Sequence, residues 1–208
     1  MVTPYRPPFQ SQFGYGTQYD DENCAATAGC IALGRHTLGK KFSNPPMMRR
    51  HTDDPNRQDG LSLSNIEYAW LHGWDEDLVN PIPYEPFAKF VSMVEAGRGA
   101  IIFGDCSYVR QGKRCPGRFP ANHALYVNEI DGTRALTYDP ADRGSSEGIR
   151  WISLDTLRNY ADNWTKIPGW VNAAYTRITV GGGPEPSPEP SPLPAGCAGT
   201  ILQTLRII

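Results

Sequence analysis

Hydrophobic residues recur at helical spacing early in the chain. Cys24, Ala28 and Ile31 are separated by four and then three residues, a spacing that predicts one buried face of a helix. We expect this helix to begin at about Asn23. It should end at Gly34, because glycine readily adopts the backbone conformation that terminates a helix.

Residues 35–60 contain three prolines and many polar groups, and they are predicted to form a long loop. Two helices should follow this loop. Ser64 and Glu67 have the spacing of a capping box, which predicts the start of a short helix. Its inward-facing residues are Ile66, Ala69 and Trp70. Four apolar residues at i, i+3, i+4 and i+7 predict a further helix that ends at Gly97. These residues are Phe87, Phe90, Val91 and Val94.

The second half of the chain changes to patterns that are typical of strands. Residues 100–103 are a short apolar run bounded by glycines, which predicts a buried strand. Residues 123–130 and 134–139 flank the dipeptide Asp131-Gly132, a strong short-range signal for a β-hairpin. An antiparallel pair of strands is therefore expected here.

One more helix and one more strand complete the predicted domain. Ser153 is placed to cap a helix. The inward-facing residues of this helix are Leu154, Leu157 and Tyr160. Residues 171–180 predict the last strand. Helices come first and an antiparallel sheet follows, which predicts an α+β fold rather than an alternating parallel one.

The domain itself is expected to span residues 18–180, after an extended arm at residues 1–17 that is rich in proline, glycine and aromatic residues. Residues 181–196 are three glycines followed by alternating prolines, which predict a stiff linker in polyproline II conformation. Residues 197–208 are too few to fold alone and too apolar to remain free in water. We interpret them as a peptide that docks onto a partner, or alternatively as a tail that folds back onto its own domain.

Composition and charge exclude several classes of function. Hydrophobic residues make up 39% and charged residues 20% of the 208 positions, as in soluble globular proteins. The net charge of -2 gives no general attraction to nucleic acid or to anionic lipid. No segment approaches the roughly 18 apolar residues that span a bilayer. The N-terminus lacks the apolar run of a signal peptide.

The five cysteines form neither a disulfide framework nor a Cys-x-x-Cys zinc site, because their number is odd and their spacing uneven. Cys106 and Cys115 are close enough in sequence to bridge a short loop. Cys24 differs from the others because it lies at a predicted helix N-terminus, where the helix dipole favours a thiolate nucleophile. Cys30 should be buried in mid-helix, and Cys197 lies beyond the linker.

Three acidic residues argue against a reactive Cys24. Asp20, Asp21 and Glu22 precede it directly, and nearby carboxylates raise the pKa of a thiol. They have no such effect if they point to solvent or cap the helix, and both arrangements are compatible with the sequence.

A cysteine nucleophile needs a base, and His123 is the best placed of the four histidines. It opens the first strand of the predicted hairpin, and Asp139 closes the second. A three-residue loop, with Ile130 paired to Arg134, puts Asp139 opposite Leu125 and therefore on the same face as His123. A two-residue loop puts the two side chains on opposite faces. In the first case the carboxylate can orient the imidazole.

Gln18 lies six residues before Cys24, where its amide could join a backbone N–H at the helix start to form an oxyanion hole. Taken one by one, a cysteine near a helix start and a histidine at a strand end usually serve packing. The ordered set Gln18, Cys24, His123 and Asp139 is much less common by chance, which favours a catalytic site.

A basic loop precedes His123. Its charges could hold the carboxylates of an acidic peptide, or they could simply face solvent. These basic residues are Arg110, Lys113, Arg114 and Arg118.

Three short segments resemble the papain-like cysteine peptidases, namely residues 18–29, 122–127 and 138–140. The likeness is nearest to the bacteriocin-processing (double-glycine leader) branch and its phage-encoded relatives, and it covers about residues 10–180. The resemblance implies an α+β papain-like fold. One departure from the family pattern is Ala25, where the family often has glycine.

The resemblance also implies a role for each residue of the set: Cys24 as nucleophile, His123 as base, Asp139 as orienting carboxylate and Gln18 as oxyanion donor. No metal or organic cofactor is implied, since these side chains supply nucleophile and base themselves.

Phage relatives of this branch act on the peptide part of the bacterial cell wall. We therefore expect an enzyme of the phage virion tail, or one released into the host cell envelope, with peptidoglycan stem peptide as substrate and a virion partner for residues 197–208. The alternatives are a protease that processes a protein precursor and an inactive virion assembly protein that keeps the fold.

Overall fold

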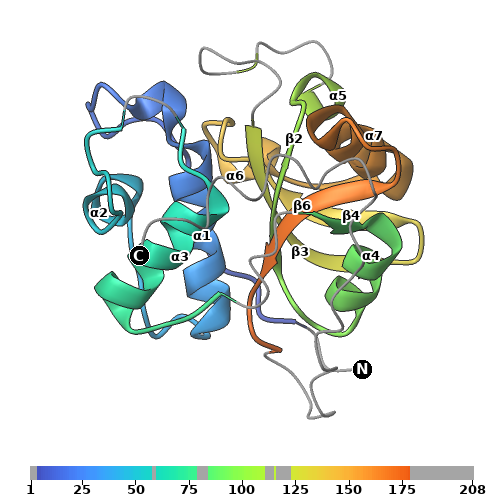
Figure 1. The fold of residues 1–208 in the computed structure, drawn as a ribbon, viewed down its shortest axis with the longest axis horizontal. Coiled ribbons are helices and arrows are strands. Elements are labelled where there is room, and N and C mark those ends of the chain that lie inside the picture. Colours follow the sequence, from blue (N-terminus) through green and yellow to red (C-terminus); the bar gives the residue numbers. More distant parts are fainter. Residues whose placement is uncertain (1–3, 58–59, 79–83, 111–114, 116–122, 179–208) are drawn as a thin grey trace, which may run out of the picture.

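The helices between residues 24 and 74 gather into one lobe, drawn in blue to teal in Figure 1. The structure is a computed structural model that describes residues 4–57, 60–78, 84–110, 115 and 123–178. The helical lobe contains α1 (Cys24–His36), α2 (Pro45–Arg50) and α3 (Leu63–Trp74). A second lobe contains the sheet, against which α4 (Phe87–Glu95) and α7 (Leu154–Thr165) lie.

α1 runs between the two lobes and is buried along its whole length. It begins directly after Asn23, as predicted, but the predicted end at Gly34 is wrong, because the helix continues to His36. The positive φ angles that reverse the chain occur later, at Leu38 (52°) and Gly39 (75°). Gly34 keeps a helical conformation and is buried.

The predicted loop at residues 35–60 is wrong in one part, because it contains α2. Asn44 caps this short helix by accepting a hydrogen bond from the backbone N–H of Met47 (2.9 Å). Pro45 occupies the first helical position, where a missing N–H costs nothing. Two of the three prolines in the predicted loop, Pro45 and Pro46, are therefore the residues that start a helix.

The capping box of α3 lies two residues earlier than predicted. Ser62 accepts from the backbone N–H of Asn65 (3.2 Å), and the side chain of Asn65 accepts in return from the backbone N–H of Ser62 (2.9 Å). Asn65 thus replaces the Glu or Gln of the usual pattern, so Ser64 and Glu67 match that pattern without forming the box. The predicted inward face is confirmed, since the following residues are buried: Ile66, Ala69 and Trp70.

Within the described residues, the sheet has six strands in the order β1-β6-β2-β3-β4-β5, and every neighbouring pair is antiparallel. The α+β expectation is thereby confirmed. The strands are β1 (Glu85–Pro86), β2 (Ala100–Gly104), β3 (His123–Asp131), β4 (Arg134–Tyr138), β5 (Ile149–Ser153) and β6 (Trp170–Tyr175).

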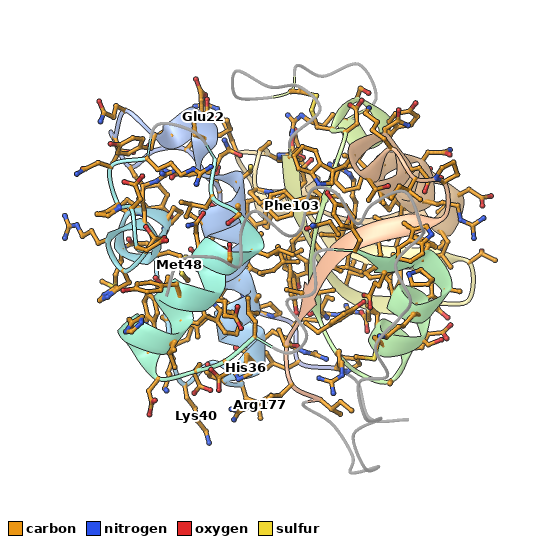
Figure 2. The ribbon with its side chains drawn as sticks, viewed as in Figure 1. Glu22, His36, Lys40, Met48, Phe103 and Arg177 are labelled. Carbon is orange, nitrogen blue, oxygen red and sulfur yellow. A yellow bond between two sulfur atoms is a disulfide. The ribbon has the colours of Figure 1, made fainter. Side chains whose placement is uncertain are left out.

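Both faces of the sheet are covered, which explains why its central strands are apolar throughout. In β2, Ile101 and Phe103 face the core shared with the helical lobe, whereas Ala100 and Ile102 face the core beneath α4 and α7. Phe103 is labelled near the junction of the two lobes in Figure 2. Helix α4 and the Ser153 cap of α7 occur as predicted, with Ser153 accepting from the N–H of Thr156 (3.1 Å).

The hairpin has the two-residue loop that the sequence analysis counted against the site. Asp131 pairs with Arg134, and Gly132 has a φ of +59°, as the first position of such a turn requires. A β-bulge between Val127 and Glu129 then shifts the register by one residue, so that Tyr126 pairs with Tyr138. Continued by one step, this register places Asp139 opposite Leu125, the alignment that a three-residue loop would have given.

Besides α2, five small elements were not expected from the sequence: η1 (Asp20–Glu22), β1, α5 (Ser107–Arg110), α6 (Ser145–Gly148) and the edge strand β5. The predicted linker at 181–196 and docking peptide at 197–208 lie outside the described residues, as do Lys113, Arg114 and Arg118. Among the residues that the structure describes, none of the helices has the length and apolar character needed to cross a membrane.

Candidate active site

Cys24 is the first residue of α1, at the end of the helix that lies near the label of Glu22 in Figure 2. Its side chain is nearly buried, with 7% exposure, and its thiol is free. The partial positive charge of a helix N-terminus favours an anion at this position. The local sequence therefore places a thiol where a thiolate is electrostatically supported.

The acidic residues before Cys24 form a 3-10 turn, η1 (Asp20–Glu22), and the carboxylate of Asp20 is bonded to the loop that precedes this turn. Its carboxylate accepts hydrogen bonds from the backbone of Gly14 (3.1 Å) and from the backbone and hydroxyl of Thr17 (3.2 and 2.7 Å). Burial raises the pKa of Asp20, but these hydrogen bonds outweigh it and lower the pKa overall. Asp21 is exposed to solvent. The Asp20 carboxylate is thus engaged by Gly14 and Thr17.

Arg49 of α2 holds the turn that delivers Cys24, and sequence reasoning missed it. The guanidinium is buried and donates to the side chain of Asn23 (3.0 Å) and to the backbone carbonyls of Glu22 (3.3 Å) and Arg57 (2.8 Å). Burial lowers the pKa of Arg49, and the nearby Tyr19, Cys24 and Glu22 oppose this effect only in part. A cation is thus fixed beside the helix start, where it favours a thiolate.

His123 and Asp139 meet at the ends of β3 and β4. Nε2 of His123 lies 2.7 Å from Oδ1 of Asp139, and both side chains are buried. The same carboxylate oxygen accepts from the backbone N–H of Ala141 (3.0 Å). Because Nε2 is engaged with Asp139, the buried Nδ1 of His123 is left for Cys24.

The pKa values of this pair move in opposite directions. Burial lowers the pKa of His123, but the charge and hydrogen bond of Asp139, followed by those of Cys24, outweigh it and raise the pKa to about 9. Burial likewise raises the pKa of Asp139, but His123, Arg110 and Arg150 hold it well below its ordinary value. At neutral pH the site therefore contains an imidazolium and a carboxylate.

Tyr160 of α7 holds the backbone of His123 in place. Its hydroxyl donates a short hydrogen bond to the carbonyl oxygen of His123. Gly104, which pairs with His123 across the β2–β3 ladder, makes room for this ring, because a Cβ there would collide with Tyr160. Tyr160 was predicted only as an inward-facing residue, and its contact with the site could not be read from its helical spacing.

Gln18 lies in the turn before η1 and is exposed to solvent. Its side chain makes no hydrogen bond within the part of the chain that the structure describes, so its oxyanion role stays a prediction. A second glutamine, Gln12, is buried and joins both halves of the site. Its amide donates to the carbonyl of Asp20 (2.9 Å), and its backbone N–H donates to the carbonyl of Pro140 (2.8 Å).

The remaining described cysteines and histidines lie elsewhere. Cys30 is buried in mid-helix, and burial raises the pKa of its thiol to about 12. Cys106 and Cys115 form a disulfide, the bridge that the sequence left open. His36 sits at the opposite end of α1, where it bonds to Glu76 (3.0 Å) and accepts from the N–H of Arg177 (3.1 Å) (Figure 2).

No family model and no curated protein matches the chain, whereas solved structures of similar fold do. A protein from Bacillus anthracis described as a C39-like peptidase has a TM-score of 0.53 at 10% identity, over 83% of this chain and 96% of that chain. The peptidase domain of Streptococcus ComA, a bi-functional ABC transporter in a quorum sensing pathway, has a TM-score of 0.41 at 13% identity, over 83% and 98%.

The fold assignment rests on the first of these similarities, which extends over almost the whole of the other chain. The two-lobed arrangement, with a buried helix against an antiparallel sheet, agrees with it. The chain therefore has the α+β papain-like fold of the C39-like peptidases, as the resemblance of its three short segments implied.

Proposed function

We propose that this protein is a cysteine peptidase in which Cys24 is the nucleophile, His123 the general base and acid, and Asp139 the orienting carboxylate. One observation carries the proposal: His123 is bonded to Asp139 on one side and influenced by Cys24 on the other. The raised pKa of His123 supports an imidazolium beside the thiol at neutral pH. The fold of the C39-like peptidases agrees with this chemistry.

The reaction follows from these positions. The Cys24 thiolate attacks the carbonyl carbon of the substrate, and His123 gives its proton to the leaving amine. Water then attacks the carbonyl carbon of the thioester while His123 accepts a proton from the water. The Cys24 thiolate leaves, the carboxylic acid product is released, and the thiolate–imidazolium pair is restored. Asp139 keeps the imidazole oriented in both steps. We assign Gln18 and the N–H of Cys24 to the oxyanion.

Labelling of the thiols tests the nucleophile without any substrate. We expect iodoacetamide at neutral pH to modify Cys24 rapidly and Cys30 not at all, because Cys30 is buried with its pKa raised to about 12. Peptide mapping by mass spectrometry distinguishes the two. A Cys24 that reacts no faster than a free cysteine would contradict the proposal.

For the substrate, we propose the peptide part of the bacterial cell wall, with a cleaved amide or peptide bond. The support is the likeness of residues 18–29 to phage-encoded relatives of this branch, which the sequence carries. Residues 1–180 incubated with purified peptidoglycan should release muropeptides that are absent with Cys24→Ala. Labelling of Cys24 without any released fragment would favour the alternative, a protease that processes a protein precursor.

For the location, we propose the phage virion tail or the host cell envelope. Residues 181–196, whose composition predicts a stiff linker, and the apolar segment at 197–208 favour attachment to a larger assembly. Mass spectrometry of purified virions should detect the chain. Intact virions that lack the chain would contradict a location in the virion tail. If the chain is present in virions but its Cys24 is unreactive, an inactive assembly protein is favoured instead.

A further inference from the structure

Behind His123, four charged side chains form a closed ring in which cations and anions alternate. Asp139 contacts Arg110 (3.2 Å) and Arg150 (2.9 Å). Asp142 contacts the same two residues, Arg150 at 2.7 Å and Arg110 at 3.5 Å. The two aspartates and Arg110 are buried, and only Arg150 is partly open to solvent, with 27% of its side chain exposed.

The ring divides the two oxygens of Asp139 between different partners. Oδ1 accepts from His123 and from the backbone N–H of Ala141. Oδ2 accepts from both guanidinium groups, Nη1 of Arg110 and Nη2 of Arg150. A carboxylate held at both oxygens cannot rotate without losing strong charge-assisted hydrogen bonds. The arginines therefore define which oxygen faces the imidazole.

Both arginines are themselves fixed. Arg150 of β5 also donates to the backbone carbonyls of Glu147 (2.8 Å) and Val109 (3.0 Å). Each terminal nitrogen of its planar guanidinium group therefore donates to one aspartate and to one backbone carbonyl. Arg110 ends α5, a short helix that follows directly after Cys106 of the Cys106–Cys115 disulfide. Asp142 accepts a hydrogen bond from Arg150 and forms an ion pair with Arg110, so it is a second anion for both cations.

We propose that Arg110, Arg150 and Asp142 are positioning residues, which hold Asp139 with one oxygen toward His123 and so maintain the Cys24–His123 pair. This role rests on the proposed peptidase function. None of the three side chains contacts the reacting atoms; each acts through Asp139.

Losing the orientation of Asp139 and losing a positive charge from the ring should change the pKa of His123 in opposite directions. This difference makes the positioning role testable. The groups that face the pair are Cys24 of α1, the ring itself, and Tyr160 of α7. Loss of one positive charge from the ring would, as a purely electrostatic effect, strengthen the hold of Asp139 on the imidazolium. Loss of orientation would weaken the hydrogen bond and release the proton of His123 at lower pH.

The experiment measures the rate of Cys24 alkylation by iodoacetamide from pH 4 to 10 in the full chain. A thiolate–imidazolium pair produces two inflections, the alkaline one where His123 loses its proton. The variants are Arg150→Gln, which removes the charge, and Arg150→Lys, which keeps the charge but not the planar fork. Arg134→Gln is the matched control, because Arg134 is an exposed arginine of the same sheet that pairs only with Asp131 among the ion pairs described.

We expect both Arg150 variants to move the alkaline inflection down by about 1 pH unit and to slow alkylation at pH 6 about tenfold or more, with the control unchanged. A wild-type profile in Arg150→Lys, or an upward shift in Arg150→Gln, would overturn the positioning role. Urea unfolding verifies that each variant is folded, and Arg150→Lys decides alone if Arg150→Gln does not fold. A single ordinary thiol inflection in the wild type would overturn the peptidase proposal itself, and the positioning role with it.

Discussion

The raised pKa of His123 predicts that the folded protein loses stability as the pH rises above neutrality. The pKa is about 9 in the folded state, against about 6.5 for an unperturbed histidine. The folded state therefore binds the proton more tightly. The stabilisation is complete below pH 6.5 and is lost as the pH rises through 9.

The size of the loss follows from the same two values. At about 1.4 kcal/mol per pH unit, the interval from 6.5 to about 9 corresponds to about 3 kcal/mol of unfolding free energy. With a urea dependence of about 1–3 kcal/mol/M, the unfolding midpoint should fall by about 1–3 M across this range. His123→Gln cannot titrate, so its midpoint should stay nearly constant between the same pH values.

Urea unfolding of the wild type and of His123→Gln at several pH values between 6 and 9.5 measures this difference. His72→Gln is the matched control, because His72 is an exposed histidine and its loss should leave the wild-type slope intact. If the unfolding midpoint changes equally with pH in the wild type and in His123→Gln, the reasoning is refuted. The proton that the folded state binds more tightly would then not reside on His123.

Three further predictions concern single residues. Cys24→Ala should abolish peptide hydrolysis while Cys30→Ala retains it, as measured by product release when both variants are given the same substrate. Gln18→Ala should lower kcat by about 10²–10³-fold, as loss of one oxyanion donor does, and full activity in this variant would remove Gln18 from the mechanism. Gly104→Ala should destabilise the fold by about 1–3 kcal/mol in thermal unfolding, because its Cβ collides with Tyr160; an unchanged Tm would show that Tyr160 can move aside.

Local patterns predicted much of the fold. The helix after Asn23, the capped helix α7 and the hairpin at Asp131-Gly132 all depend on residues within one or two turns of each other. The errors concern helix ends, which also depend on local residues. Gly34 matches the rule for a helix C-terminus, but Gly39 has the positive φ angle. Ser64 matches the rule for a capping box, but Ser62 forms it. Such signals predict that an element exists more reliably than they predict its boundaries.

The residues that support the site could not be predicted, because they meet it only through the tertiary fold. Arg110 was considered as a solvated residue or as a group that binds an acidic peptide, and the structure shows neither, since it is buried against Asp139. Arg150 lies on an edge strand too short to show a clear alternation. Arg49 was hidden in a segment that its prolines marked as a loop.

The hairpin shows how a local prediction can fail while its consequence holds. The two-residue loop alone would pair Asp139 with Tyr126 and turn its side chain away from the face of His123. The bulge at Asn128 inserts one residue into β3 and restores the face, so that the two side chains meet at 2.7 Å. Bulges often re-aim a side chain beside an active site. The meeting of His123 and Asp139 thus depends on one extra residue five positions away, and that residue has no signature in a pattern of alternating polar and apolar positions.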